Sequence, residues 1–425
     1  MQIHVVQRGD TLYRMSQRYG VTVNEIAAAN GIDNQNALVV GQSVIIPTEA
    51  ASHTVLSGET LWLIAQRYGV TIQELAAANR ITNPALINTG QTLVIPQAAK
   101  PVIEVNAYTE KFGPPGVAIV EEIGEYLTYL SPFSHRVRAD GTFSGLDDAA
   151  VINAAYANRV APMMVITNFE NGTFSSDIAH AVLSDTAAQE RLIANILATM
   201  RQKGYQALNV DFEYVRPADR EAYNAFLQRL VDALHPHNYL VSTCLAPKIS
   251  ATQTGTLYEA HDYPAHGRIV DFVVLMTYEW GWSGGPPRAV APLNEVVKVL
   301  NYAVTVIPPE KILMGMPLYG YDWTLPYVQG AKWAPTVSPK EAVERAAEFG
   351  GTIRYDEEGQ SPYYNYYDRE GREHVVWFED ARSVQAKFNV VKAYKLRGVS
   401  YWVLGVPFPQ NWYVLNANFT IKKLV

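Results

Sequence analysis

The chain has 425 residues, of which 48% are hydrophobic and 18% charged, and this composition is typical of a folded protein with two or three domains. The formal net charge of −7 argues against binding to a nucleic-acid backbone and against electrostatic binding of an acidic polymer. The single cysteine, Cys244, excludes a disulfide within the chain and a zinc site made of several cysteines.

Two copies of one small unit open the chain. His4–Leu12 recurs as His53–Leu61 at an offset of 49 residues, and the same offset holds through the rest of each copy. Each copy begins with a β-branched run, continues with two capped segments of helical periodicity and ends with a second β-branched run. The sequence therefore predicts two tandem α+β domains with the order βααβ, at residues 2–47 and 52–96.

Strand-like and helix-like segments alternate over the remaining residues, 101–425. This length accommodates an α/β barrel of about 250 residues with insertions, and the alternation predicts a (β/α)8 TIM barrel. The predicted strands are Val102–Tyr108, Tyr126–Phe133, Ala161–Phe169, Ala207–Tyr214, Leu240–Ala246, Ile269–Tyr278, Lys311–Tyr319 and Val399–Leu404. The predicted helices between them are Leu146–Asn158, Thr186–Lys203, Pro217–Leu234, Leu293–Val306, Pro339–Phe349 and Asp380–Leu396.

Two segments depart from this alternation. Gly113–Gly124 is rich in glycine and proline and predicts no helix, and Thr352–Phe378 predicts a small β-rich insertion between the last two strands. The connectors at residues 48–52 and 97–101 are short and carry no large apolar side chain. We therefore expect the barrel to fold without the two repeats.

Three polar residues, Asn209, Asp211 and Glu213, alternate with apolar residues on the fourth predicted strand and so share one face. One interpretation is an exposed antiparallel strand with a solvated face. In a parallel barrel, however, strands are buried on both faces, and active sites lie at their C-terminal ends, where Glu213 is placed. A neighbouring carboxylate such as Asp211 raises the pKa of Glu213, which suits a general acid.

The repeats resemble the LysM module in their Gly-Asp-Thr-Leu signature (Gly-Glu-Thr-Leu in the second copy), Ala-Asn helix end and Gly-Gln…Ile-Pro terminus. This resemblance implies that glycans containing N-acetylglucosamine bind in a shallow groove between two loops of each copy. Alternatively, the glycine and threonine of the signature only build a turn and a helix cap. The implied glycan-binding residues are Gly9, Asp10, Thr11, Leu12 and Asn30 in the first copy, and Gly58, Glu59, Thr60, Leu61 and Asn79 in the second.

The pattern Gln206-x-x-Asn209-x-Asp211-x-Glu213 is similar to the Asp-x-x-Asp-x-Asp-x-Glu signature of family-18 glycoside hydrolases, although the first two acids are absent. The resemblance implies that Glu213 is the general acid and base and that Asp211 orients the acetamido group of the substrate. Asn209 is able to hydrogen-bond Asp211, but it cannot share a proton with it as an aspartate would.

Two further segments carry the same resemblance. Met276-Thr277-Tyr278-Glu279 is similar to the family's Met-x-Tyr-Asp, which implies that Tyr278 binds the acetamido oxygen and that Glu279 replaces the aspartate as a substrate contact. Trp402 corresponds to the tryptophan under the sugar whose bond breaks; the alternative for Tyr278 and Trp402 is a core aromatic role. Asn209, Met276 and Tyr319 complete the implied set of substrate-binding residues.

Over its whole length the chain resembles the spore cortex-lytic N-acetylglucosaminidases of spore-forming bacilli. The resemblance implies retaining, substrate-assisted hydrolysis of β-1,4 bonds after N-acetylglucosamine in cortex peptidoglycan during germination. We expect a monomer, made without a Sec signal peptide and placed in the coat and cortex region of the spore, which binds peptidoglycan glycan strands and no nucleic acid, membrane, metal or cofactor. Two alternatives stay open: a chitinase and a non-catalytic peptidoglycan-binding lectin.

Overall fold

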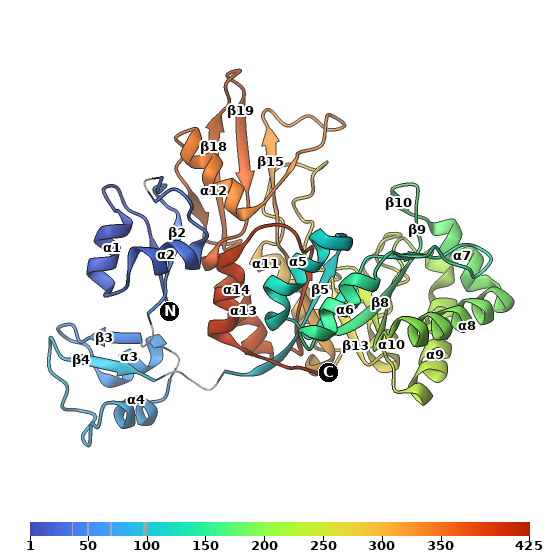
Figure 1. Ribbon diagram of the computed structural model, residues 1–425, viewed down its shortest axis with the longest axis horizontal. Coiled ribbons are helices and arrows are strands. Elements are labelled where there is room, and N and C mark those ends of the chain that lie inside the picture. The colour runs from blue at the N-terminus through green and yellow to red at the C-terminus, as the bar shows by residue number, and fades with distance from the viewer. Residues whose placement is uncertain (36, 49–50, 69, 97–99) are drawn as a thin grey trace.

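The computed structural model describes residues 1–425 except 36, 49–50, 69 and 97–99 (Figure 1). Two small βααβ domains precede the larger unit, as predicted. In each of them the two strands pair antiparallel. Their elements are β1 (Gln2–Val5), α1 (Leu12–Tyr19), α2 (Val23–Asn30) and β2 (Ser43–Ile46), then β3 (Ala51–Thr54), α3 (Leu61–Tyr68), α4 (Ile72–Ala78) and β4 (Thr92–Ile95).

Local capping interactions define where these short helices begin and end. The Thr22 hydroxyl accepts a hydrogen bond from the Glu25 backbone N–H while the Glu25 carboxylate accepts one from the Thr22 N–H, and Thr71 forms the same capping box. Gly20 ends α1 in the left-handed conformation. Each domain therefore has the helix signals that its sequence predicts, and each encloses a small core of its own.

Eight parallel strands close into a barrel, because β11 pairs with both β12 and β8. Every predicted barrel strand is confirmed, but most end earlier than predicted; β11, for example, ends at Asp211. The barrel strands are β5 (Val102–Thr109), β6 (Tyr129–Pro132), β8 (Ala161–Thr167), β11 (Ala207–Asp211), β12 (Leu240–Leu245), β13 (Phe272–Leu275), β14 (Ile312–Pro317) and β20 (Gly398–Trp402).

Helices cover the outside of the barrel, and one of them corrects a prediction. Gly113–Gly124 was expected to contain no helix, yet α5 spans Gly113–Ile123. Its prolines lie in the first turn, where a backbone N–H has no intrahelical acceptor to lose. The other helices are α6 (Ala149–Ala157), α7 (Ser176–Ser184), α8 (Thr186–Lys203), α9 (Arg220–Leu234), α10 (Tyr263–Ile269), α11 (Leu293–Ala303), α13 (Ala381–Tyr394) and α14 (Pro409–Asn418). Across the described ranges, no helix combines the length and apolarity needed to cross a membrane.

The predicted β-rich insertion is present and is larger than expected. It forms a five-stranded antiparallel sheet that stands on the rim of the barrel (Figure 1). The predicted helix Pro339–Phe349 belongs to this insertion, because Ala342 and Ala346 pack against Tyr364 and Val376 of its sheet. The elements are β15 (Gly320–Thr324), β16 (Thr336–Val337), α12 (Pro339–Glu348), β17 (Arg354–Asp356), β18 (Ser361–Tyr367) and β19 (Glu373–Trp377).

The first βααβ domain is packed against the barrel and the insertion. In Figure 1 it lies beside α14, and the second domain lies further out. Ile45 of β2 is fully buried within the main hydrophobic cluster of the barrel, and Val39 joins the cluster of the insertion. The first copy is thus docked by apolar residues of its own surface and not of the connector, and the expectation that the barrel folds without the repeats stays a prediction.

A pair of equivalent glycines tests this docking. Gly41 and Gly90 both have φ of +86, but a Cβ at Gly41 would lie 1.8 Å from the Ile353 carbonyl oxygen, whereas none of the described atoms lies within 4 Å of one at Gly90. Alanine at this φ costs about 1–2 kcal/mol at either site, and at Gly41 it also separates the domain from the insertion. We expect Gly41→Ala, and not Gly90→Ala, to speed hydrogen exchange of the Ile353 N–H, which donates to the Val40 carbonyl. Equal exchange in both variants would contradict the docking.

Candidate active site

Strand β11 carries the central polar residues of the predicted site. Asn209 and Asp211 are buried inside the barrel, with exposed fractions of 0% and 5%. The strand ends at Asp211, so Glu213 follows it at the C-terminal mouth of the barrel, where it is half-buried. Glu213 therefore lies at the end of the barrel where the sequence places it, although on the turn after the strand.

A residue that the sequence analysis did not select fixes the position of Glu213. The Asn168 side chain accepts a hydrogen bond from the Glu213 backbone N–H at 3.0 Å and donates one to the Glu213 carbonyl at 2.8 Å. Asn168 directly follows β8 and is fully buried. It holds the Glu213 backbone at both its N–H and its carbonyl group.

Asn209 takes part in a different network from the one expected. Its side-chain oxygen accepts hydrogen bonds from the Tyr108 hydroxyl at 2.9 Å and the Cys244 thiol at 3.3 Å, and its amide donates to the Ser242 hydroxyl at 3.0 Å. No bond from Asn209 to Asp211 is among the contacts that the structure describes. The expected Asn209–Asp211 bond is replaced because β5 and β12 bring other polar groups into reach of the amide.

The two carboxyl groups on this side of the mouth have shifted acidities. Burial raises the pKa of Asp211, and its Oδ1 atom is buried with no hydrogen-bond partner in the described part of the chain. Burial also raises the pKa of Glu213 well above its usual value, and the negative charges of Asp211 and Glu279 raise it further. Glu213 can therefore stay protonated where an exposed glutamate would be ionised.

The other predicted contacts gather around the same mouth. A cavity of about 180 Å³ is lined by Glu213, Met276, Tyr278 and Glu279, together with Ala246, Pro247, Leu257, Tyr258 and Trp280. Trp402 ends β20, and its ring lies 4.8 Å from that of Phe133 and 5.6 Å from that of Tyr108, measured between centroids.

Tyr319 and Tyr321 hold the carboxylate of Glu279. Both hydroxyls donate to its Oε1 atom, Tyr321 at 3.0 Å, and the Tyr319 side chain is buried behind it. Although Glu279 as a whole residue is partly exposed, burial of its carboxyl raises its pKa. Tyr319 thus lies next to the predicted substrate contact, and Tyr321 is an addition that the sequence analysis did not name.

The charge of Glu279 predicts a measurable pH effect. A general acid works while it is protonated, so activity falls as the pH rises through its pKa. Because the charge of Glu279 raises the pKa of Glu213, Glu279→Gln should move the alkaline limb of the kcat/KM profile to lower pH, whatever its effect on the maximum. Profiles on soluble substrate, compared with Glu310→Gln at the opposite end of β14, measure the shift; an unmoved limb would contradict it.

The predicted glycan-binding residues of the first copy have local structural contacts. Thr11 caps α1 by accepting from the Arg14 N–H, and Asp10 accepts from the Gln7 N–H and lies 2.8 Å from His4. Gly9 has a φ of +90, and Leu12 is buried. The Asn30 amide donates to the carbonyls of Ile26 and Ile45.

The second copy repeats this arrangement. Thr60 accepts from the Leu63 N–H, and Glu59 accepts from the Leu56 N–H. Gly58 has a φ of +83, Leu61 is buried, and the Asn79 amide donates to the carbonyls of Leu75 and Val94. The turn and cap roles that the sequence left open are therefore real in both copies, and they leave Thr11 and Leu56 at the surface. No group of three potential metal-binding side chains occurs among the residues that the structure describes.

Comparisons with known proteins identify the families to which the barrel and the two small domains are similar. Residues 158–406 match the family described as Glycosyl hydrolases family 18, and residues 4–47 and 53–96 match the LysM domain. The chain is 52% identical over 430 residues to the "Cortical fragment-lytic enzyme" of Bacillus subtilis (strain 168), covering 100% of this chain and 99% of that protein.

Two solved structures extend the comparison. The spore cortex-lytic enzyme SleL of Bacillus megaterium QM B1551 superposes with a TM-score of 0.90 at 42% identity, over 100% of this chain and 99% of that one. A chitinase from Chromobacterium violaceum ATCC 12472 superposes with a TM-score of 0.69 at 28% identity, over 74% of this chain and 98% of that one. The similarity to the first of these proteins thus includes both small domains as well as the barrel.

Proposed function

Because the chain belongs to family 18 of the glycosyl hydrolases and carries two LysM domains, we propose that it cleaves cortex peptidoglycan fragments after N-acetylglucosamine during spore germination. The chain is a glycoside hydrolase. The observation that carries the proposal is Glu213, a carboxyl with a raised pKa at the mouth of the barrel, held there by Asn168. Two relatives of nearly equal length are named a cortical fragment-lytic enzyme and a spore cortex-lytic enzyme.

In this proposal Glu213 donates its proton to the glycosidic oxygen as the bond from C1 to that oxygen breaks. A retaining glycosidase ordinarily needs a second carboxylate about 5 Å away as the nucleophile. Asp211 lies two residues earlier on the strand, deeper in the barrel, and is a poor candidate for reaching the far face of the sugar. The acetamido oxygen of the substrate therefore forms the new bond to C1 and gives an oxazolinium ion.

Water then completes the reaction. Glu213, now a carboxylate, takes a proton from a water molecule that attacks C1, and the oxazolinium ring opens with retention at C1. Asp211 receives the acetamido N–H on its unpartnered Oδ1 atom, and Tyr278 donates to the acetamido oxygen. Trp402 supports the distorted sugar ring. Asn209 stabilises the barrel interior next to Asp211 through its hydrogen bonds to Tyr108 and Ser242.

The remaining predicted residues act at the rim of the mouth. Glu279 accepts hydrogen bonds from sugar hydroxyls, and the hydroxyls of Tyr319 and Tyr321 hold its carboxylate in place for this task. Met276 contributes an apolar wall to the cavity. All these groups come from one barrel, so we propose that the chain acts as a monomer. Its domains span residues 2–47, 52–96 and 101–425. We place its action in the coat and cortex region of the spore.

Turnover of purified cortex fragments tests the proposal. New reducing ends, with N-acetylglucosamine at the new end by mass spectrometry, are the expected result, and colloidal chitin should be cleaved more slowly. The likeness to the bacterial chitinase makes chitin the relevant rival, and faster turnover of chitin would favour that reading. Binding of fragments without any release of reducing ends would instead indicate a lectin.

A further inference from the structure

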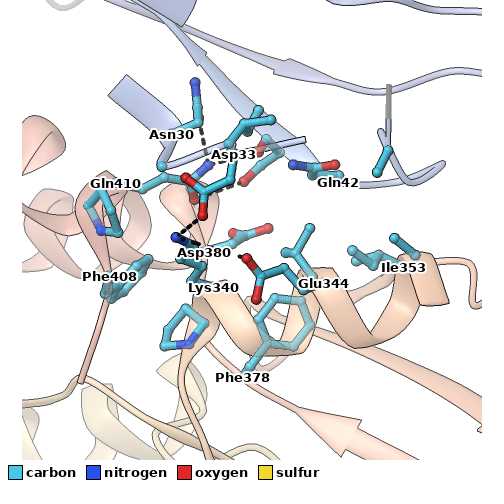
Figure 2. A pocket seen from close by; sticks show the side chains of 18 of the residues that line it. Asn30, Asp33, Gln42, Lys340, Glu344, Ile353, Phe378, Asp380, Phe408 and Gln410 are labelled. Carbon is cyan, nitrogen blue, oxygen red and sulfur yellow. Dashed lines mark hydrogen bonds and ion pairs between the residues drawn. The ribbon is translucent and has the colours of Figure 1, made fainter. Parts of the chain in front are cut away.

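The first LysM domain is joined to the catalytic unit through its α2–β2 side. The Gln410 amide, at the start of α14, donates to the Asn30 side-chain oxygen at 2.7 Å and to the Ser43 carbonyl at 2.8 Å. All three residues are buried. Figure 2 shows Asn30 and Gln410 close together, with Asp33 reaching Lys340 of α12, 2.6 Å away. Residues of the first LysM domain and of the catalytic unit therefore build one continuous interface.

This interface occupies one of the two loops that the LysM resemblance assigns to glycan binding. Gly31 is in tight contact with the catalytic unit, since a Cβ there would lie 2.7 Å from Pro409. A cavity of about 440 Å³ separates the rest of this loop from α12 (Figure 2), and it is lined by Ile32, Asp33 and Asn34 on one side and by Lys340, Val343 and Glu344 on the other. A glycan strand along this loop would have to enter the space between it and α12, which the Asp33–Lys340 ion pair crosses.

The second LysM domain repeats the same internal contacts without the docking. Asn79 hydrogen-bonds Val94 as Asn30 hydrogen-bonds Ile45. Ile45, however, is completely buried, whereas Val94 is 47% exposed. The hydrogen bonds that the structure describes for residues 52–96 all stay within this domain. Its corresponding face is therefore open to solvent.

Exposed apolar side chains gather around the loops of the second domain. Trp62 follows the Gly-Glu-Thr-Leu signature and is 54% exposed, and Leu86, in the α4–β4 connection, is 70% exposed. Leu56 adds a third exposed side chain before the signature, and hydrogen bonds between Val55 and the residues 90–91 bring its loop beside that connection. An exposed indole offers a flat apolar face with a polar edge, which suits stacking on a sugar ring.

We propose that the two LysM domains divide their tasks. The second domain binds the glycan strands of insoluble peptidoglycan through the surface around Trp62, and the first is a fixed part of the catalytic unit that holds the second beside the barrel. The proposal rests on the proposed function, because it takes peptidoglycan as the partner. It assigns the anchoring of the polymer to one of two domains that are nearly identical in sequence pattern.

Equivalent exposed aromatics provide the test. Tyr13 occupies in the first domain the position of Trp62 in the second, and it is 67% exposed. Both are replaced by alanine in the full-length chain carrying Glu213→Gln, so that the polymer is not degraded, and binding to insoluble cortex sacculi is measured by co-sedimentation. We expect Trp62→Ala to weaken binding about tenfold or more, as for a central aromatic contact, and Tyr13→Ala to change it less than about twofold.

The possible results distinguish a failure of the division of tasks from a failure of the proposed function. An equal loss in both variants would overturn the division of tasks, and so would a loss in Tyr13→Ala alone. Leu86→Asp, on the neighbouring loop of the second domain, should reproduce the loss, and thermal unfolding checks that each variant is folded. If the chain with intact Tyr13 and Trp62 does not bind sacculi at all, the peptidoglycan partner itself is wrong.

Discussion

Glu213→Gln is expected to lower kcat on cortex fragments by a factor of about 10² or more, because general acid catalysis contributes about that much. Glutamine keeps the size of the side chain but cannot donate the proton to the leaving oxygen. The Asn168 side chain hydrogen-bonds the backbone of residue 213 and not its side chain, so the turn after β11 should keep its geometry in the variant. The measurement is steady-state release of reducing ends, with calorimetry to follow fragment binding.

The control for this variant is Glu310→Gln, an exposed carboxyl in the short helix before β14, at the opposite end of the barrel. It should have the turnover of the unmodified chain. Fragment binding should persist in Glu213→Gln, since the cavity keeps its shape. Turnover within tenfold of the unmodified chain would show that another group donates the proton.

The barrel could be predicted because each strand is a short buried run between helical segments, and this pattern is local. The ends of the elements were harder to predict. In β11 the alternation of polar and apolar residues continues to Tyr214, but pairing with β8 stops at Asp211 and Thr167 and the backbone at Tyr214 has a φ of +53. The length of a strand therefore depends on how far the neighbouring strand continues to pair with it, and the residue pattern along one segment does not contain this information.

The candidate site divides in the same way. Asp211 and Glu213 were found together because their spacing along one strand places them on one face. Asn168 was missed because its contact with Glu213 joins the ends of two strands that are 45 residues apart in the chain. The expected Asn209–Asp211 bond fails for a related reason, since the side chains that bind Asn209 come from β5 and β12.

The docking of the first LysM domain had only a weak signal in the sequence. Ile45 and Val94 occupy equivalent outward positions and are both β-branched, yet one is buried and the other is exposed. Ile3 faces Ile45 across the first sheet, whereas Ser52 faces Val94 in the second. The apolar pair Ile3 and Ile45 indicates that the outer face of the first sheet is also buried. This signal is visible only when the two copies are compared.

The requirement for an acetamido group is the second large effect. Asp211 is buried, and its Oδ1 atom has no hydrogen-bond partner in the described part of the chain. A buried carboxylate oxygen normally accepts a hydrogen bond, so a donor is missing at this atom. In the proposed mechanism the acetamido N–H is that donor and the acetamido oxygen is the nucleophile. A well-oriented intramolecular nucleophile has an effective molarity on the order of 10⁵ M or more, so its loss should bring cleavage below detection.

Fragments de-acetylated at the sugar before the scissile bond should therefore bind but not be cleaved, and re-acetylation of the same fragments should restore cleavage. A thiazoline analogue of the oxazoline should inhibit competitively, because it offers the ring that Asp211 and Tyr278 hold. Proton NMR of the first product should detect the β anomer, since attack by the acetamido oxygen and then by water inverts C1 twice. Efficient cleavage after glucosamine, or an initial α anomer, would mean that a protein carboxylate or a directly attacking water molecule takes the place of the substrate's own nucleophile.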